Sequence, residues 1–274
     1  MTVWIASILA LFVWWFSTGA ILMAVKYADR RGPAARIRAT VLGLPMLSLG
    51  IWGFWMSLTD TSVFGAYIAF LSALGIWGWI ELAFLTGVIT GPNTYTLPPH
   101  TPEWERFIRA WGTLAYHEML LVGTLITMFL IDANLAAANK FATWTFAVLF
   151  FARISAKLNL FFGVPRINVD FLPSALSHLS SYFRIRPLNW LFPISVTALT
   201  FAAGCWLERI NDAQTQGAIT GFALLSAITL LALLEHWVMV LPIPDAKLWR
   251  WMLPAPKTTT PKTTLKHQGG HHGL

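Results

Sequence analysis

The sequence predicts an all-α, polytopic integral membrane protein with seven transmembrane helices. Apolar residues make up 56% of the 274 residues and charged residues only 11%, against about 25% in a typical soluble domain. So little charge could not cover that much apolar surface in water. The 15 Trp residues agree with a membrane location, because their rings anchor helices at lipid headgroups. The positive residues behind the net charge of +7 flank apolar runs, so topology explains them better than nucleic-acid binding.

Seven apolar runs reach or approach the roughly 20 residues that span a bilayer core about 30 Å thick. The first has no basic residue before it and a basic cluster after it, which favours a retained helix over a cleaved signal peptide. The third is long and is expected to tilt, and the sixth is short. The runs are Val3 to Val25, Thr40 to Leu58, Val63 to Thr90, Phe107 to Ile131, Phe141 to Leu160, Trp190 to Leu207 and Ala218 to Leu241.

The distribution of positive residues tests this number of helices. Of the 19 Lys and Arg residues, 17 fall in alternate loops and adjoining helix ends and in the C-terminal segment, whereas only Lys140 and Arg209 fall on the other side. Because short loops rich in Lys and Arg stay in the cytoplasm, this bias predicts an external N-terminus and a cytoplasmic C-terminus. A wrong number of helices would scramble the alternation.

A short amphipathic helix is predicted between the fifth and sixth runs, at about residues 170–184, lying on the cytoplasmic leaflet. Leu172, Leu176 and Leu179 recur at helical spacing, and Ser residues occupy the other faces. His178 falls on the polar side and is expected to be solvated. This helix and the residues after it offer a candidate interaction surface, made of His178, Tyr182, Arg184 and Arg186.

Residues 1–252 are predicted to form a single transmembrane domain. Residues 253–274 are mostly Thr, Lys, Pro, Gly and His, and are expected to form a disordered basic cytoplasmic tail because they have almost nothing to bury. Within the domain, small residues are expected to let helices approach closely. These are the pairs Gly50 and Gly53, and Gly75 and Gly78.

Ionisable residues inside the apolar runs are the best candidates for function, because charge is costly in lipid. Counted from the cytoplasmic helix ends at 1.5 Å per residue, four helices place them about 9 to 15 Å deep. We therefore expect one connected layer of charge in the cytoplasmic half, in which Arg153 reaches at least one Glu. The candidates are Glu81, His117, Glu118, Arg153, Glu235 and His236.

Several chemistries fit this layer. The first is a buried ion-pair network in which Arg153 neutralises a carboxylate. The second is a proton relay, and the third is a single His that ligates the magnesium of a chlorin. The fourth is a metal centre, although adjacent His and Glu residues point about 100° apart, unlike the Glu-x-x-His pairs of di-iron bundles. The candidate metal ligands are Glu81, Glu118, His117, Glu235 and His236.

Six motifs spread over nearly the whole chain are specific in combination, though each alone is weak. They are WIELAFL at 79–85, YHE at 116–118, RISAKLN at 153–159, FLP at 171–173 running on to SYF at 181–183, LNWLFP at 188–193 and LEHW at 234–237. In these motifs the chain resembles the PuhE family of photosynthetic complex assembly proteins from purple bacteria and their relatives.

This resemblance implies a role in building the photosynthetic reaction centre and its light-harvesting complex in the bacterial inner, intracytoplasmic photosynthetic membrane. It implies effects on bacteriochlorophyll supply, and partners among membrane lipid, reaction-centre or light-harvesting subunits, other assembly factors and pigment. The family supplies no catalytic residues. Two alternatives stay open: a membrane enzyme that acts on a pigment precursor through a metal held by intramembrane Glu and His, and a transporter or proton relay.

Overall fold

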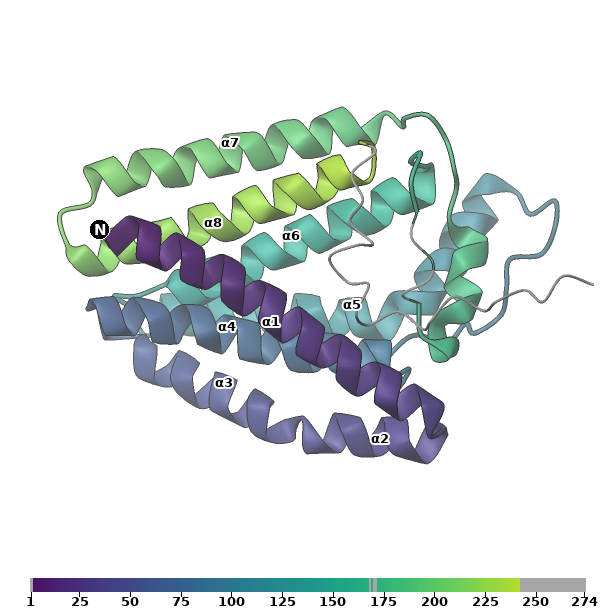
Figure 1. Ribbon diagram of the computed structural model, residues 1–274, viewed down its shortest axis with the longest axis horizontal. Coiled ribbons are helices and arrows are strands. Elements are labelled where there is room, and N and C mark those ends of the chain that lie inside the picture. The colour runs from purple at the N-terminus through teal and green to yellow at the C-terminus, as the bar shows by residue number, and fades with distance from the viewer. Residues whose placement is uncertain (1, 168, 170–171, 242–274) are drawn as a thin grey trace, which may run out of the picture.

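The computed structural model describes residues 2–167, 169 and 172–241, and this part of the chain is a helical bundle without β-strands (Figure 1). Seven spans in it are long and apolar enough to cross a membrane, which confirms the predicted fold class and number of helices. The predicted tail of residues 253–274 and the last part of the predicted domain, residues 242–252, lie outside the described residues.

The described residues form eight α-helices and one 3-10 helix. There are eight α-helices for seven spans because the second span consists of two helices. The elements are α1 (Thr2–Arg30), α2 (Pro33–Leu42), α3 (Leu44–Ser57), α4 (Val63–Leu85), α5 (Glu103–Asn134), α6 (Phe141–Phe162), η1 (Ser174–Tyr182), α7 (Leu191–Asp212) and α8 (Gln216–Val238).

The break in the second span follows from its sequence. Pro45 has no N–H to donate to the carbonyl four residues earlier, so the helical ladder cannot run through it unbroken. Gly43 separates α2 from α3 at this point. A Cβ on Gly43 would lie 2.8 Å from Cδ2 of Leu82, so a larger residue would press against α4.

The third span is shorter than its apolar run predicts. The helix ends at Leu85 rather than continuing to Thr90, because Gly87 adopts a φ of 77° and turns the chain. The Thr86 hydroxyl caps this end by donating to the Leu82 carbonyl oxygen at 2.8 Å. At 1.5 Å per residue, the 23 residues of α4 extend about 34 Å, which is enough to cross a bilayer core of about 30 Å.

The centre of the bundle is formed by α4 and α8, most of whose side chains are buried. In Figure 1, α1 crosses both of them, α3 runs along α4 and α7 runs along α8. Small residues allow these approaches. A Cβ on Gly50 would lie 2.9 Å from the backbone nitrogen of Ile76, so the expected close contact at Gly50 is confirmed. Ala6 and Ala10 are fully buried in the same core.

Connections between the spans alternate between the two ends of the bundle (Figure 1). One end, here called the basic end, carries the α1–α2 turn, loop 86–102 and segment 163–190. Lys140 and Arg209 lie at the opposite end, at the start of α6 and the end of α7. The loops therefore lie at the two ends of the bundle in the arrangement that the distribution of positive residues predicted.

The short helix expected at about residues 170–184 is present in its described part as the 3-10 helix η1. Its apolar side chains turn inward, and Leu176 and Leu179 pack against Phe84 at the end of α4. The helix therefore covers the basic end of the bundle. His178 is also buried, so its predicted solvation was wrong.

Candidate functional site

An ion pair between α4 and α6 lies at the centre of the charged layer. Arg153 donates from Nη2 to Oε2 of Glu81 at 3.0 Å, which confirms that Arg153 reaches a Glu side chain. Glu81 is nearly buried, whereas 38% of the Arg153 side chain is exposed. Both charges are thus neutralised within the spans, as the cost of charge in lipid requires.

A second ion pair, between Lys157 on α6 and Glu118 on α5, was not predicted. The Lys157 ammonium donates to Oε1 of Glu118, and both side chains are more buried than Arg153. The sequence contained a signal for it, because Lys157 follows Arg153 by one helical turn and therefore shares its face.

His117 lies beside the first ion pair without joining it by a hydrogen bond. Its Nε2 is 3.8 Å from Oε1 of Glu81, beyond hydrogen-bond distance. Its ring packs on the Phe84 ring with centroids 4.3 Å apart, and the side chain is fully buried. Among the described residues, neither ring nitrogen of His117 has a hydrogen-bond partner.

His236 is held by two hydrogen bonds that fix its tautomer. Its Nδ1 lies 2.8 Å from the Ala232 carbonyl oxygen, which can only accept, so Nδ1 carries the hydrogen. In the neutral ring Nε2 then accepts from the Ser155 hydroxyl, at 2.8 Å. The Ser155 hydroxyl therefore already binds Nε2, the ring nitrogen with which His236 would coordinate a metal ion or the magnesium of a chlorin.

Glu235, next to His236, makes its contact with α1 and not with either ion pair. It is exposed, and its Oε1 accepts a hydrogen bond from Trp14 on α1 at 3.2 Å. The positive charge of Arg153 also acts on it. Trp14, Arg153 and Glu235, which come from α1, α6 and α8, are here called the lateral polar patch.

The charged layer is therefore two ion pairs with attached polar groups. Within the described part of the chain, no three His, Cys, Asp or Glu side chains are grouped so that they could hold a metal ion. Four of the five candidate metal ligands instead have other partners: Glu81 pairs with Arg153, Glu118 with Lys157, His236 with Ser155 and Glu235 with Trp14. The fifth, His117, lies beside Glu81 with no hydrogen-bond partner among the described residues. The geometry favours the ion-pair network among the predicted chemistries.

A second polar region at the basic end is organised by the buried side chain of Arg106, which the sequence presented only as a loop charge. Its Nη2 donates to the carbonyl oxygens of Phe161, at 2.7 Å, and of Tyr182. The guanidinium carbon lies 3.8 Å from the centroid of the Phe161 ring. Arg106 thereby joins the start of α5 to the ends of α6 and η1.

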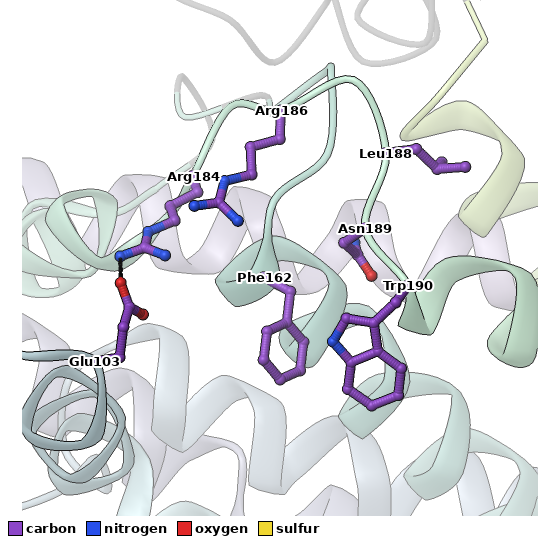
Figure 2. A pocket seen from close by; sticks show the side chains of 7 residues that line it. All are labelled: Glu103, Phe162, Arg184, Arg186, Leu188, Asn189 and Trp190. Atoms are coloured by element: carbon purple, nitrogen blue, oxygen red, sulfur yellow. Dashed lines mark hydrogen bonds and ion pairs between the residues drawn. The ribbon is translucent and has the colours of Figure 1, made fainter.

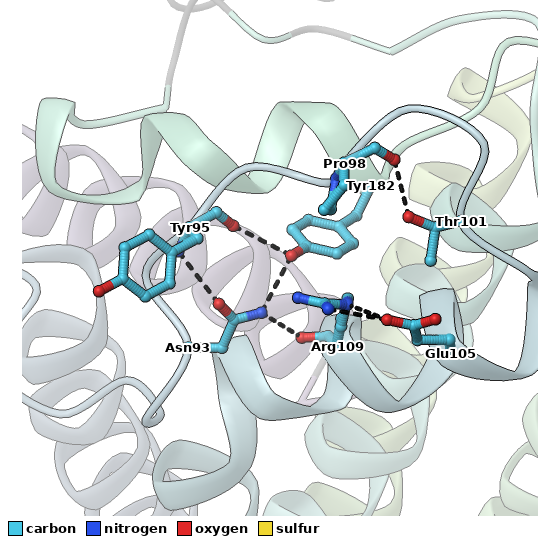
Figure 3. A network of polar contacts seen from close by, with 7 residues as sticks. All are labelled: Asn93, Tyr95, Pro98, Thr101, Glu105, Arg109 and Tyr182. Carbon is cyan, nitrogen blue, oxygen red and sulfur yellow. Dashed lines mark hydrogen bonds and ion pairs between the residues drawn. The ribbon is translucent and has the colours of Figure 1, made fainter.

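Figure 3 shows a network that attaches loop 86–102 to this region. The Tyr182 hydroxyl donates to the Tyr95 carbonyl oxygen at 3.0 Å and accepts from Nδ2 of Asn93 at 2.9 Å. Asn93 also donates to the Arg109 carbonyl oxygen at 2.9 Å. The network holds the loop along α5, beside the first turns of the helix.

Two Asn residues from the sequence motifs join α6 to α7. Asn189 donates to Oδ1 of Asn159 at 3.0 Å and to the Gly163 carbonyl oxygen at 2.8 Å. Asn159 in turn donates to the Ser195 hydroxyl at 3.0 Å. Both Asn side chains are buried, which accounts structurally for their place in the motifs.

The predicted interaction surface is only partly exposed. His178 and Tyr182 are buried, and burial lowers the pKa of His178. Arg184 pairs with Glu103 at the start of α5, whereas Arg186 is exposed. Of the four residues, the two Arg residues therefore remain available to a ligand or partner.

Comparisons with known proteins found a matching family and a similar protein. Residues 1–260 match a family described as Protein of unknown function (DUF3623). The chain is also 56% identical over 252 residues to the "Uncharacterized 30.4 kDa protein in puhA 5'region" of Rhodobacter capsulatus, over 92% of this chain and 91% of that protein. No solved structure matches it.

Proposed function

Because this chain belongs to the family described as Protein of unknown function (DUF3623), whose description names no activity, we propose its function from its own geometry and from its relative. We propose that it is a non-enzymatic membrane assembly factor for the photosynthetic reaction centre and light-harvesting complex. It binds pigment–protein subunits sideways, within the membrane, through the lateral polar patch of Trp14, Arg153 and Glu235.

The relative from Rhodobacter capsulatus supports the photosynthetic part of this proposal. Its name places it in the 5' region of puhA, which is consistent with the photosynthetic role that the sequence motifs imply. With 56% identity over nearly the full length of both proteins, a shared membrane role is a reasonable premise. The more specific part of the proposal, that the protein acts in assembly, is argued from the geometry of the patch.

The observation that carries the proposal is that charged groups in the spans remain open to the outside of the bundle. The Arg153 side chain is 38% exposed although it is ion-paired, and Glu235 is exposed with one hydrogen bond from Trp14. A charge costs about 2.5 to 3.5 kcal/mol at the centre of a spanning helix on insertion scales. Arg153 lies near the centre of α6, whereas Glu235 lies in the last turn of α8. A second membrane protein with a polar group at this depth would lower that cost.

The patch offers both kinds of hydrogen-bonding group to such a partner. Arg153 presents further N–H donors beyond the one that Glu81 accepts, and Glu235 has a second carboxylate oxygen. Hydrogen bonds between membrane helices contribute about 0.6 to 2 kcal/mol each. Two such bonds would give a reversible contact, which suits a factor that releases its client after assembly.

The proposal is tested by photo-crosslinking in photosynthetic membranes. A photoreactive amino acid at position 235 is expected to crosslink to a reaction-centre or light-harvesting subunit. The matched control is position 51, because Ile51 is also exposed and lies on α3, which contributes no residue to the patch. The variant Arg153→Gln is expected to reduce crosslinking from position 235.

Equal crosslinking from positions 235 and 51 would contradict a specific contact. Crosslinking from position 235 to lipid alone, while complexes assemble at the normal rate, would also contradict the proposal. The enzyme alternative predicts a different result, namely a pigment precursor that accumulates when the charged layer is altered.

A further inference from the structure

A shallow groove of about 440 Å³ lies at the basic end, between the end of α6 and the start of α7 (Figure 2). It combines charged side chains on one side with aromatic rings on the other. Its lining consists of Glu103, Phe162, Arg184, Arg186, Leu188, Asn189 and Trp190. None of these residues belongs to the lateral polar patch.

The groove carries an excess of positive charge. Arg184 pairs with Glu103, and the buried Arg106 has its Nη1 3.5 Å from the same carboxylate. Arg186 is exposed and close enough to Arg106 to act on its charge, yet within the described residues it has no ion pair. Three guanidinium groups therefore share one carboxylate, which leaves the groove able to accept an anion.

Arg186 is held in place before any ligand arrives. A Cβ on Gly163 would lie 2.9 Å from Cγ and Cδ of Arg186, so the Arg stem packs directly over this Gly. Gly163 has a φ of 117°, which favours Gly at this position. The backbone nitrogen of Arg186 also donates to the Val164 carbonyl oxygen at 3.2 Å.

The aromatic side of the groove lies where the spans end. Phe162 is the last residue of α6, and Trp190 immediately precedes α7. Their ring centroids are 5.4 Å apart, and Figure 2 shows the two rings side by side below Arg186. Trp190 is 65% exposed, as expected of a Trp at the level of the lipid headgroups.

We propose that this groove binds an anionic phospholipid from the leaflet at the basic end. The phosphate lies against Arg186 and Arg184, and an acyl chain passes over Phe162 and Trp190. Arg binds phosphate through paired N–H donors, and basic pockets on the cytoplasmic side of membrane proteins recognise anionic headgroups. The adjoining aromatic rings favour a lipid over a soluble phosphate. This inference does not depend on the proposed function.

The test uses the full chain purified in a neutral detergent. Phosphatidylglycerol is titrated in and its retention is followed by native mass spectrometry, with phosphatidylcholine as the zwitterionic comparison. Arg186→Gln is expected to weaken phosphatidylglycerol binding about fivefold, the effect of one Arg near a charged membrane surface. Arg38→Gln is the matched control, because Arg38 is exposed on α2 at the same end, and it is expected to leave binding unchanged.

A variant that is expected to strengthen lipid binding makes the test more specific. Glu103→Gln removes the carboxylate that competes for Arg184, so phosphatidylglycerol is expected to bind more tightly. Arg186→Lys keeps the charge and is expected to retain most of the binding, which separates a lost anion site from a misfolded protein.

Three results would overturn the proposal. The first is equal binding of phosphatidylcholine, and the second is equal weakening by Arg186→Gln and Arg38→Gln. The third is competition by inorganic phosphate at concentrations similar to those of the lipid, which would identify the groove as a site for a soluble anion.

Discussion

Arg153 on α6 donates a hydrogen bond to Glu81 on α4, with 3.0 Å between Nη2 and Oε2, inside the spans of the bundle. Lys157, one turn further along α6, reaches Glu118 on α5. One face of α6 thus supplies the positive member of two ion pairs with two different helices. These pairs tie α6 to both neighbours, and they differ in exposure, which makes their contributions to stability separable.

Replacing Arg153 by Leu is expected to destabilise the bundle, because it leaves the Glu81 carboxylate nearly buried without its partner. Loss of one member of a fully buried pair costs about 3 to 5 kcal/mol, and we expect about 1 to 3 kcal/mol here because Arg153 is 38% exposed. The double variant Glu81→Gln with Arg153→Leu should recover part of the loss. Thermal unfolding in detergent measures both, and a double variant as unstable as the sum of the single variants would show that the two residues do not couple.

Replacing Lys157 by Met is expected to cost more than replacing Arg153 by Leu. Lys157 and Glu118 have side-chain exposures of only 17% and 5%, so the stranded carboxylate would remain buried inside the bundle. The expected loss is about 3 to 5 kcal/mol. Unfolding of the two variants side by side checks the order, and a smaller loss for Lys157→Met would refute this ranking by burial.

The lateral polar patch is expected to affect assembly without altering pigment chemistry. Glu235→Gln replaces the carboxyl group by an amide and keeps the shape, and it should lower the yield of reaction centre or light-harvesting complex in membranes. Pigment analysis should show normal intermediates. Leu234→Ala is the control, because Leu234 is the adjacent residue on α8 and is also exposed. Accumulation of one pigment precursor in Glu235→Gln would favour the enzyme alternative instead.

Loop 86–102 is expected to depend on the absence of a side chain at Gly91. A Cβ there would lie 2.2 Å from the Gly112 carbonyl oxygen on α5, so Gly91→Ala must push the loop off the helix. Gly123→Ala is the matched control, since a Cβ at Gly123 meets nothing within 4 Å. It should be neutral or stabilise α5 by about 0.5 to 1 kcal/mol. Limited proteolysis in loop 86–102 should increase for Gly91→Ala alone, and equal protection of both variants would contradict the close contact.

His178 is expected to make the protein less stable in mild acid. Burial lowers the pKa of His178 below its usual value of about 6.5. Below about pH 6.5 the unfolded chain therefore binds more protons at this site than the folded chain, so the free energy of unfolding falls as the pH falls. His178→Gln should reduce the loss of melting temperature between pH 7.5 and pH 5.5, whereas replacement of the exposed His100 should not. An unchanged pH profile in His178→Gln would show that other groups dominate.

The amino-acid pattern was sufficient to predict the membrane spans, because each transmembrane helix satisfies its backbone hydrogen bonds within one continuous apolar segment. The helix ends were less predictable. Apolarity continues from Leu85 to Thr90, and only the positive φ of Gly87 ends α4. The depth of Glu81, His117 and Arg153 could likewise be counted along their helices, which is why their meeting could be predicted.

By itself, the sequence determined that this protein crosses the membrane seven times and that its intramembrane charges share one layer, because both depend on distance along a chain of fixed rise per residue. Only the tertiary structure decided which charges pair, since that depends on how each helix is rotated toward its neighbours. Lys157 forms an ion pair with Glu118, the Ser155 hydroxyl hydrogen-bonds to Nε2 of His236, and Glu235 accepts a hydrogen bond from Trp14. The same rotation of packed elements buried His178 and left Arg186 exposed beside the groove.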